Sequence, residues 1–205
     1  MSGTNEAMRA PRQARSQASA GRMLDAALAI LEREGAAGLT ITSVSQESGV
    51  SNGSLYHRFG DRQGLLLAAQ QRFLEKLEAD WLSASAPLWQ SEALDTVLAR
   101  LVEEYLETFA AHRRIFHAFM VTGDNDPELR ARGAETGRRI AHFMIEQLTG
   151  RFGCSPEAAD TAHRILFSQV TLMTMFADEE ISAHAVNAEV RRAQLAAALK
   201  AVLTD

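Results

Sequence analysis

The sequence predicts an all-α protein with a small N-terminal domain of three helices and a larger C-terminal helical domain. Ala, Leu, Glu and Arg recur at helical spacing, no long alternation of Val, Ile and Thr suggests a sheet, and only four prolines interrupt the chain. Its 205 residues suffice for a well-buried core. We expect a disordered basic arm over residues 1–15, a helical domain over 16–62 and the larger domain over 63–205.

Charge is distributed unevenly along the chain. Residues 1–62 carry seven arginines and six acidic residues, whereas the remainder carries fourteen basic and twenty acidic residues, within a net charge of −5. Four arginines fall in the first 22 residues against one acidic residue: Arg9, Arg12, Arg15 and Arg22. The arm also contains Pro, Ser and Gln, so it is either a segment that orders on phosphate or a solvated tail.

Helix signals follow one another between residues 16 and 49. The first helix is expected over residues 16–34, where apolar residues recur on one face, and Gly35 ends it. Thr40 is placed to cap a second helix over residues 41–48. Gly49 follows it and can adopt the left-handed conformation of a tight turn.

A third short helix, predicted to run from its cap Ser51 to about His57, has the composition of a DNA-reading element. Leu55 points inward, which leaves these residues facing outward: Asn52, Ser54, Tyr56 and His57. The small residues at the helix start allow close approach of phosphates to its free N–H groups. The Asn52 amide can pair with an adenine edge, and His57 or Tyr56 can bond a base or a phosphate.

This stretch resembles the N-terminal domain of the TetR (tetracycline-repressor-like) transcriptional regulators, and the resemblance covers about residues 22–67. It is carried by these residues: Gly-Leu-Thr at 38–40, Gly-Val-Ser at 49–51, Gly-Ser-Leu-Tyr at 53–56, Phe59, Asp-Arg at 61–62 and Leu-Leu at 65–66. The resemblance implies a homodimer that binds a double-stranded DNA operator, usually as a repressor. It further implies release when a small-molecule effector enters a pocket in the C-terminal domain.

Four positions depart from the family's pattern, and at two of them, Ser45 and Ser48, a small Ser replaces the usual Ala. Arg58 stands where the family commonly has His, and Arg62 stands where it commonly has a phosphate-contacting Lys. Arginine keeps the charge of lysine and can grip a phosphate with two parallel hydrogen bonds. The candidate DNA-binding residues are Thr40, Ser51, Asn52, Gly53, Ser54, Tyr56, His57, Arg58 and Arg62.

Six further long or medium helices are expected in the C-terminal domain. A helix that starts after Asp61 and ends at Pro87 carries an apolar stripe from Leu66 to Trp81, so we expect it to link the two domains mechanically. Proline, glycine and cap residues mark the others, at about residues 92–111, 112–121, 127–152 and 156–177, with a last helix capped by Asn187.

The last two long helices carry apolar residues on more than one face. A helix needs one apolar stripe to pack on its own domain, so a second stripe implies a second partner. The resemblance implies a four-helix dimer interface built from residues near 158–177 and 188–203. The alternative is that both faces lie inside a monomer.

Aromatic and thioether side chains dominate the middle helices. They can surround a mostly apolar ligand, with a histidine as the polar group, although core packing explains the same residues. The candidate ligand-binding residues are Phe109, His112, Phe116, Phe119, Met120, Phe143, Phe167 and Met173.

An all-α enzyme and a protein-binding helical adaptor are the competing classes. Di-iron bundles carry Glu-x-x-His pairs, and the closest imitation here is Asp160-x-x-His163. Neither paired histidines nor a Gly-rich phosphate loop occurs, so we expect no catalytic residues, metal or cofactor. The single Cys154 fits a reducing cytoplasm, and no apolar stretch approaches the length of a membrane span.

Overall fold

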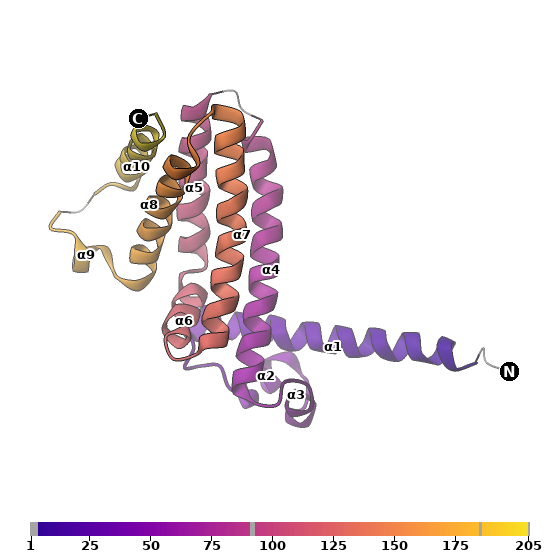
Figure 1. Ribbon diagram of the computed structural model, residues 1–205. Coiled ribbons are helices and arrows are strands. Elements are labelled where there is room, and N and C mark those ends of the chain that lie inside the picture. The colour runs from indigo at the N-terminus through magenta and orange to yellow at the C-terminus, as the bar shows by residue number, and fades with distance from the viewer. Residues whose placement is uncertain (1–3, 91–92, 185, 205) are drawn as a thin grey trace.

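The computed structural model describes residues 4–90, 93–184 and 186–204. At one end, α1 (Thr4–Glu34) runs crosswise, with α2 (Ile41–Ser48) and α3 (Asn52–Phe59) packed beside it (Figure 1). Six other helices form a bundle that stands upright on α1: α4 (Arg62–Leu88), α5 (Leu94–Ala111), α6 (Arg113–Gly123), α7 (Pro127–Phe152), α8 (Pro156–Met175) and α10 (Ala188–Thr204). The short α9 (Asp178–Ile181) lies beside the bundle, on the connection between α8 and α10. The described residues contain no strand, so the predicted fold class is confirmed.

Side-chain caps set the helix starts in the N-terminal domain. Thr40 and Ser43 form a reciprocal capping box, in which the Ser43 N–H donates to Thr40 Oγ1 at 2.9 Å. Ser51 Oγ accepts from the Ser54 N–H at 3.3 Å and so begins α3. Each cap satisfies a backbone donor that the first helical turn leaves free. The sequence-predicted starts of α2 and α3 are confirmed.

Two glycines make the turns around α3 possible. Gly49 adopts a left-handed conformation, with φ of 67°, between α2 and α3. A Cβ on Gly64 would fall 2.0 Å from the carbonyl oxygen of Phe59, so only glycine permits α4 to start this close to the end of α3. Asp61 caps α4 by accepting the Gly64 N–H at 2.8 Å.

Several predicted boundaries differ from the structure. The first helix begins at Thr4, so residues 4–15 are helical where we expected disorder. Ala, Arg and Gln residues in this segment favour the helix. Pro87 lies inside the last turn of α4, which ends one residue later. The helix predicted to reach residue 177 ends at Met175, and the short α9 follows. Glu92, the predicted start of the next helix, lies outside the described residues.

Two hydrophobic cores meet along α4. The N-terminal core consists of the buried apolar residues of α1–α3, their connecting loops and the first half of α4, together with Ile115, Phe116, Ala118, Phe119 and Leu129 from α6 and α7. The C-terminal core consists of the buried apolar residues of α5, α8 and α10 with Trp81, Leu88, Trp89, Met144, Leu148 and Cys154. Helix α4 therefore belongs to both cores. Among the helices described, none has the length and apolarity needed to cross a bilayer.

Candidate DNA-binding interface and ligand cavity

The outer face of α3 is open to solvent. Leu55 is fully buried in the N-terminal core, and the half-buried Phe59 packs against that core, which fixes the rotation of α3. On the opposite face Asn52, Tyr56 and His57 are exposed, and Tyr56 retains 55% of its accessible surface. A rigid helix with polar groups on its free face has the geometry of a major-groove reader.

The start of α3 leaves room for an anion. Ser51, Gly53 and Ser54 are all exposed, and the Ser51 and Ser54 hydroxyl oxygens lie 3.0 Å apart. A Cβ on Gly53 would meet no atom within 4 Å, so the backbone there is uncovered. Thr40 is exposed at the start of α2, where its hydroxyl serves the capping box. Both helix starts present the positive end of a helix dipole to solvent.

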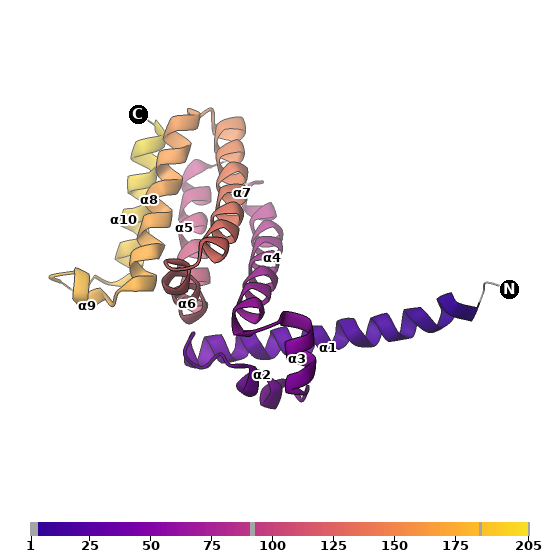
Figure 2. The same ribbon diagram turned by 60° about the horizontal axis from the view of Figure 1, so that its bottom comes forward.

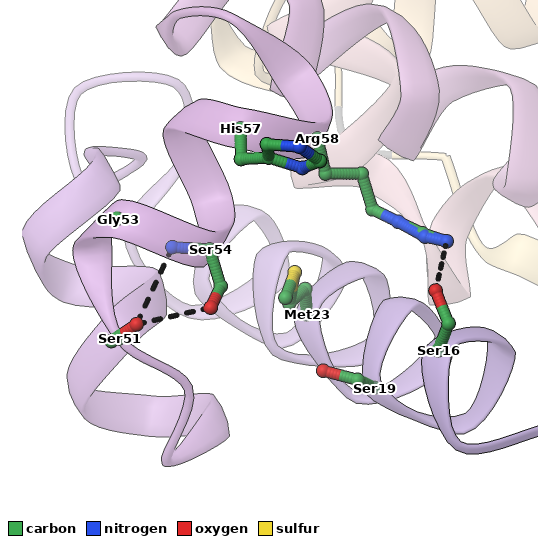
Figure 3. Close-up of a pocket in the computed structure, with 8 residues that line it drawn as sticks. All are labelled: Ser16, Ser19, Met23, Ser51, Gly53, Ser54, His57 and Arg58. Carbon is green, nitrogen blue, oxygen red and sulfur yellow. Dashed lines mark hydrogen bonds between the residues drawn. The ribbon is translucent and has the colours of Figure 1, made fainter. Parts of the chain in front are cut away.

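A groove of about 580 Å³ separates α3 from α1 (Figure 3). Its α1 wall is formed by Ser16, Ser19 and Met23, and its α3 wall by Ser51, Gly53, Ser54, His57 and Arg58. The sequence did not point to Ser16 or Ser19, because two serines on the polar face of a helix carry no signal of what packs opposite them. Their hydroxyls add hydrogen-bonding groups to the candidate interface.

The two arginines near α3 both make contacts within the protein. Arg58 Nη2 donates to Ser16 Oγ at 3.3 Å and so bridges the groove (Figure 3). Arg62 Nε donates to the Leu39 carbonyl at 2.7 Å, and its Nη2 donates to the Ala36 carbonyl. Arg62 was predicted as a phosphate contact. It remains exposed, but it also fastens the α1–α2 connection to the start of α4.

A second cavity, of about 800 Å³, lies within the bundle between α4, α5, α6, α7 and α8. Five of the predicted ligand-binding residues line it: Phe109, Phe116, Phe119, Met120 and Phe167. The rings of Phe109 and Phe116 stack with centroids 4.1 Å apart, and Phe167 meets Phe109 edge-on at 6.4 Å. The sequence therefore located the aromatic part of this cavity.

The other three predicted ligand-binding residues lie elsewhere. His112 sits against α1, with its Nδ1 3.6 Å from Glu32 Oε2. Phe143 packs edge-on against Trp81 and Trp89, at centroid distances of 5.5 and 6.2 Å. Met173 packs against the C-terminal core. Helical periodicity placed these residues inward but did not distinguish a packed interior from a cavity wall.

Further lining residues were missed as ligand contacts, among them Gln70, Trp81, Tyr105, Thr136 and His163. The Tyr105 ring lies 6.2 Å from that of Trp81 and 6.5 Å from that of His163. Burial raises the pKa of the Tyr105 phenol and lowers the pKa of His163, so both are neutral at neutral pH. Trp81 was predicted only as part of the apolar stripe of the helix that links the two domains.

An exposed reading helix on a helix-turn-helix scaffold, joined to a helical bundle, defines the class of DNA-binding transcriptional regulators. Residues 23–69 match the family model described as bacterial regulatory proteins, tetR family. The chain therefore carries an N-terminal DNA-binding domain of the TetR family.

Two curated relatives are regulators of transcription. The chain is 28% identical over 160 residues to the HTH-type transcriptional regulator CymR of Pseudomonas putida, covering 76% of this chain and 77% of CymR. It is 40% identical over 55 residues to BetI of Paraburkholderia xenovorans, a match that spans only 28% of that protein.

Two solved structures share the fold of this chain at low sequence identity. One is described as a TetR-family regulator of Mesorhizobium loti, with a TM-score of 0.75, 18% identity and coverage of 92% of this chain and 96% of that one. The other is a transcriptional regulator of Saccharomonospora viridis in complex with choline, with a TM-score of 0.66, 17% identity and coverage of 90% and 95%.

Proposed function

We propose that this protein is a cytoplasmic homodimeric repressor that binds a double-stranded DNA operator and leaves it when a small, mostly apolar molecule occupies the bundle cavity. The observation that carries the proposal is that one helix serves both sites. Gln70, Leu74, Leu77 and Trp81 of α4 line the cavity, while the first turns of α4 pack in the core beneath α3.

The DNA contact divides into reading and positioning. Asn52 pairs with an adenine edge in the major groove, and Tyr56 and His57 bond a neighbouring base or phosphate. The hydroxyl-lined start of α3 and the groove beside α1 hold backbone phosphates and set the register. Residues 4–15 extend α1 beyond α3 (Figure 2), and the arginines in this segment provide charge for a flanking phosphate.

The outer side of α8 supports the dimer. Leu172 and Phe176 are each more than 40% exposed, and Val190 at the start of α10 is 47% exposed. Large apolar side chains gathered on neighbouring helices are typical of a surface that another copy covers. A dimer through α8 and α10 presents two reading helices to two half-sites one helical turn apart.

Occupation of the cavity is coupled to DNA through α4. A ligand that favours a pivoted α4 changes the separation of the two reading helices, so that both no longer fit successive major grooves. Couplings of this kind are about 1–3 kcal/mol.

The test begins with selection of duplexes from a random pool by the full-length protein. We expect an enriched sequence with two-fold symmetry, and binding that weakens as salt rises. Placed before a reporter gene, that sequence should lower expression when the protein is present. Recovery of no preferred sequence refutes the proposal, and increased reporter expression refutes its repressor part.

A further inference from the structure

The cavity opens to solvent between α7 and α8. Its lining residues on α4, α5 and α6 are mostly buried, among them Trp81, Tyr105 and Phe116. The exposed lining residues all lie on α7 and α8, and together they define the mouth: Arg130, Ala134, Arg138, Arg164, Phe167 and Ser168. A ligand that passes the mouth meets the aromatic residues of the cavity floor, which include Tyr105, Phe109 and Phe116.

The mouth is cationic. Three of its six residues are arginines, and the cavity lining holds one carboxylate, Asp160. Arg164 Nε donates to Asp160 at 2.6 Å, so that carboxylate is already paired. Arg130 is likewise paired, with Asp124 at 2.7 Å. His163 adds no charge, because burial lowers its pKa.

Arg138 differs from its two neighbours. It lines the mouth, and among the described side chains it has no hydrogen-bond or ion-pair partner. Its neighbour Arg139, by contrast, is held by Glu78 and Glu135. An arginine fork next to an apolar cavity matches the geometry of a carboxylate, which it can bind through two parallel hydrogen bonds.

We propose that the cavity takes an aryl carboxylic acid, with its carboxylate on Arg138 at the mouth and its apolar body against the rings of Phe109 and Phe116. This inference rests on the proposed function and adds the chemical class of its ligand. A cavity of about 800 Å³ accommodates a molecule of drug-like size. The floor supplies apolar contact area, and Arg138 supplies orientation.

The same residues disfavour a cation. A quaternary ammonium ligand is attracted to the faces of aromatic rings, but a net positive charge beside those rings repels it. Here Asp160 is neutralised by Arg164, and Arg138 leaves the mouth with excess positive charge. A neutral arene would fill the floor but leave Arg138 unused.

Three probes that share a naphthalene ring and differ in charge test the assignment: naphthalene-2-carboxylate, its isosteric amide naphthalene-2-carboxamide, and (naphthalen-2-ylmethyl)trimethylammonium. Their affinities for the full-length protein are measured by titration calorimetry. We expect the carboxylate to bind at least about 10-fold more tightly than the amide, as a charge-assisted arginine contact allows. We expect the ammonium to bind most weakly.

Arg138→Gln should remove the preference for the carboxylate and leave the affinity for the amide unchanged. Arg151→Gln is the matched control, because Arg151 is an exposed arginine on the same helix that does not line the cavity. This control should keep the wild-type preference. The comparison of probes on the wild-type protein tests the assignment even if Arg138→Gln folds poorly.

Equal affinity for carboxylate and amide, tighter binding of the ammonium, or no binding of any probe at millimolar concentration overturns the assignment. Operator binding is measured on the same preparation. Failed probes with intact operator binding refute the ligand class alone. Loss of sequence-specific DNA binding by the wild-type protein refutes the proposed function, whatever the probes do.

Discussion

The ion pair between Glu78 of α4 and Arg139 of α7 fastens α4 to the wall of the cavity. Arg139 Nε donates to Glu78 Oε1 at 2.9 Å, and its Nη2 donates to Glu78 Oε2 at 2.7 Å. The Glu78 side chain is only 22% exposed, whereas that of Arg139 is 46% exposed. Arg139 Nη2 also donates to Thr136 Oγ1, on the cavity wall, at 3.1 Å.

Replacement of Glu78 by Gln keeps the shape and removes the charge. An exposed ion pair contributes up to about 1 kcal/mol, and the two-pronged, half-buried geometry places this pair at the upper end of that range. For a chain of this length, about 1 kcal/mol corresponds to a melting temperature lower by about 2–4 °C. Asp80→Asn is the matched control, because its pair with Lys76 lies on the same helix and both side chains are mostly exposed.

The effect of Glu78→Gln depends on pH. Arg139 lowers the pKa of Glu78 in the folded protein below its ordinary value of 4.5, chiefly through the hydrogen bond. Stability from this shift is fully present above the unfolded value and is lost as pH falls through the folded value. Thermal melts followed by circular dichroism should therefore show the deficit at neutral pH and a smaller deficit in acid. A Glu78→Gln protein that melts with wild type at neutral pH, or no earlier than Asp80→Asn, contradicts this reasoning.

Substitutions at three further positions test other parts of the molecule. Asn52→Ala should relax the preference at one base position by about 1–3 kcal/mol in a duplex competition assay; an unchanged preference moves base reading to Tyr56 and His57. Arg62→Ala should cost about 1–2 kcal/mol in urea unfolding, because two backbone carbonyls lose a donor, and should also flatten the salt dependence of DNA binding by about one unit. Arg62→Lys should restore the salt dependence only, so full recovery of stability would argue against the two-carbonyl contact. Gly137→Leu should raise the free energy of unfolding by about 0.5–1 kcal/mol, since a Cβ there meets no atom within 4 Å and leucine favours helix. Because Gly137 lines the cavity, the leucine should also weaken binding of the naphthalene probes. A lower free energy of unfolding would show that the position is crowded.

Signals that act within a few residues along the sequence predicted the helices of the N-terminal domain well. Caps such as Thr40 and Ser51, and a left-handed glycine such as Gly49, act within a few residues, so their effect can be read along the chain. The limits of α1 and α8 were less well predicted, because helix ends depend on weak propensities where no cap or breaker stands. The short α9 carries too few residues to show a period.

The candidate sites were predicted only in part, for a different physical reason. An inward-facing aromatic residue has the same spacing whether it only packs against the core, as Phe143 does, or also borders a cavity, as Phe116 does. The distinction depends on which helices meet there, and that is a tertiary property. The groove beside Ser16 and the paired state of Arg62 are tertiary in the same way, since each involves partners more than 20 residues away.

The contribution of α6 to the N-terminal core bears on how the molecule unfolds. The apolar residues of the N-terminal domain pack partly against Ile115, Phe116 and Phe119, which lie beyond residue 110 in the chain. A fragment ending near residue 67 would expose these apolar residues to water, so the N-terminal domain is not an autonomous folding unit. Denaturation of the whole chain should accordingly be one cooperative transition. Transfer of the N-terminal domain to another helical bundle should require the contacting surface of α6 to be transferred with it.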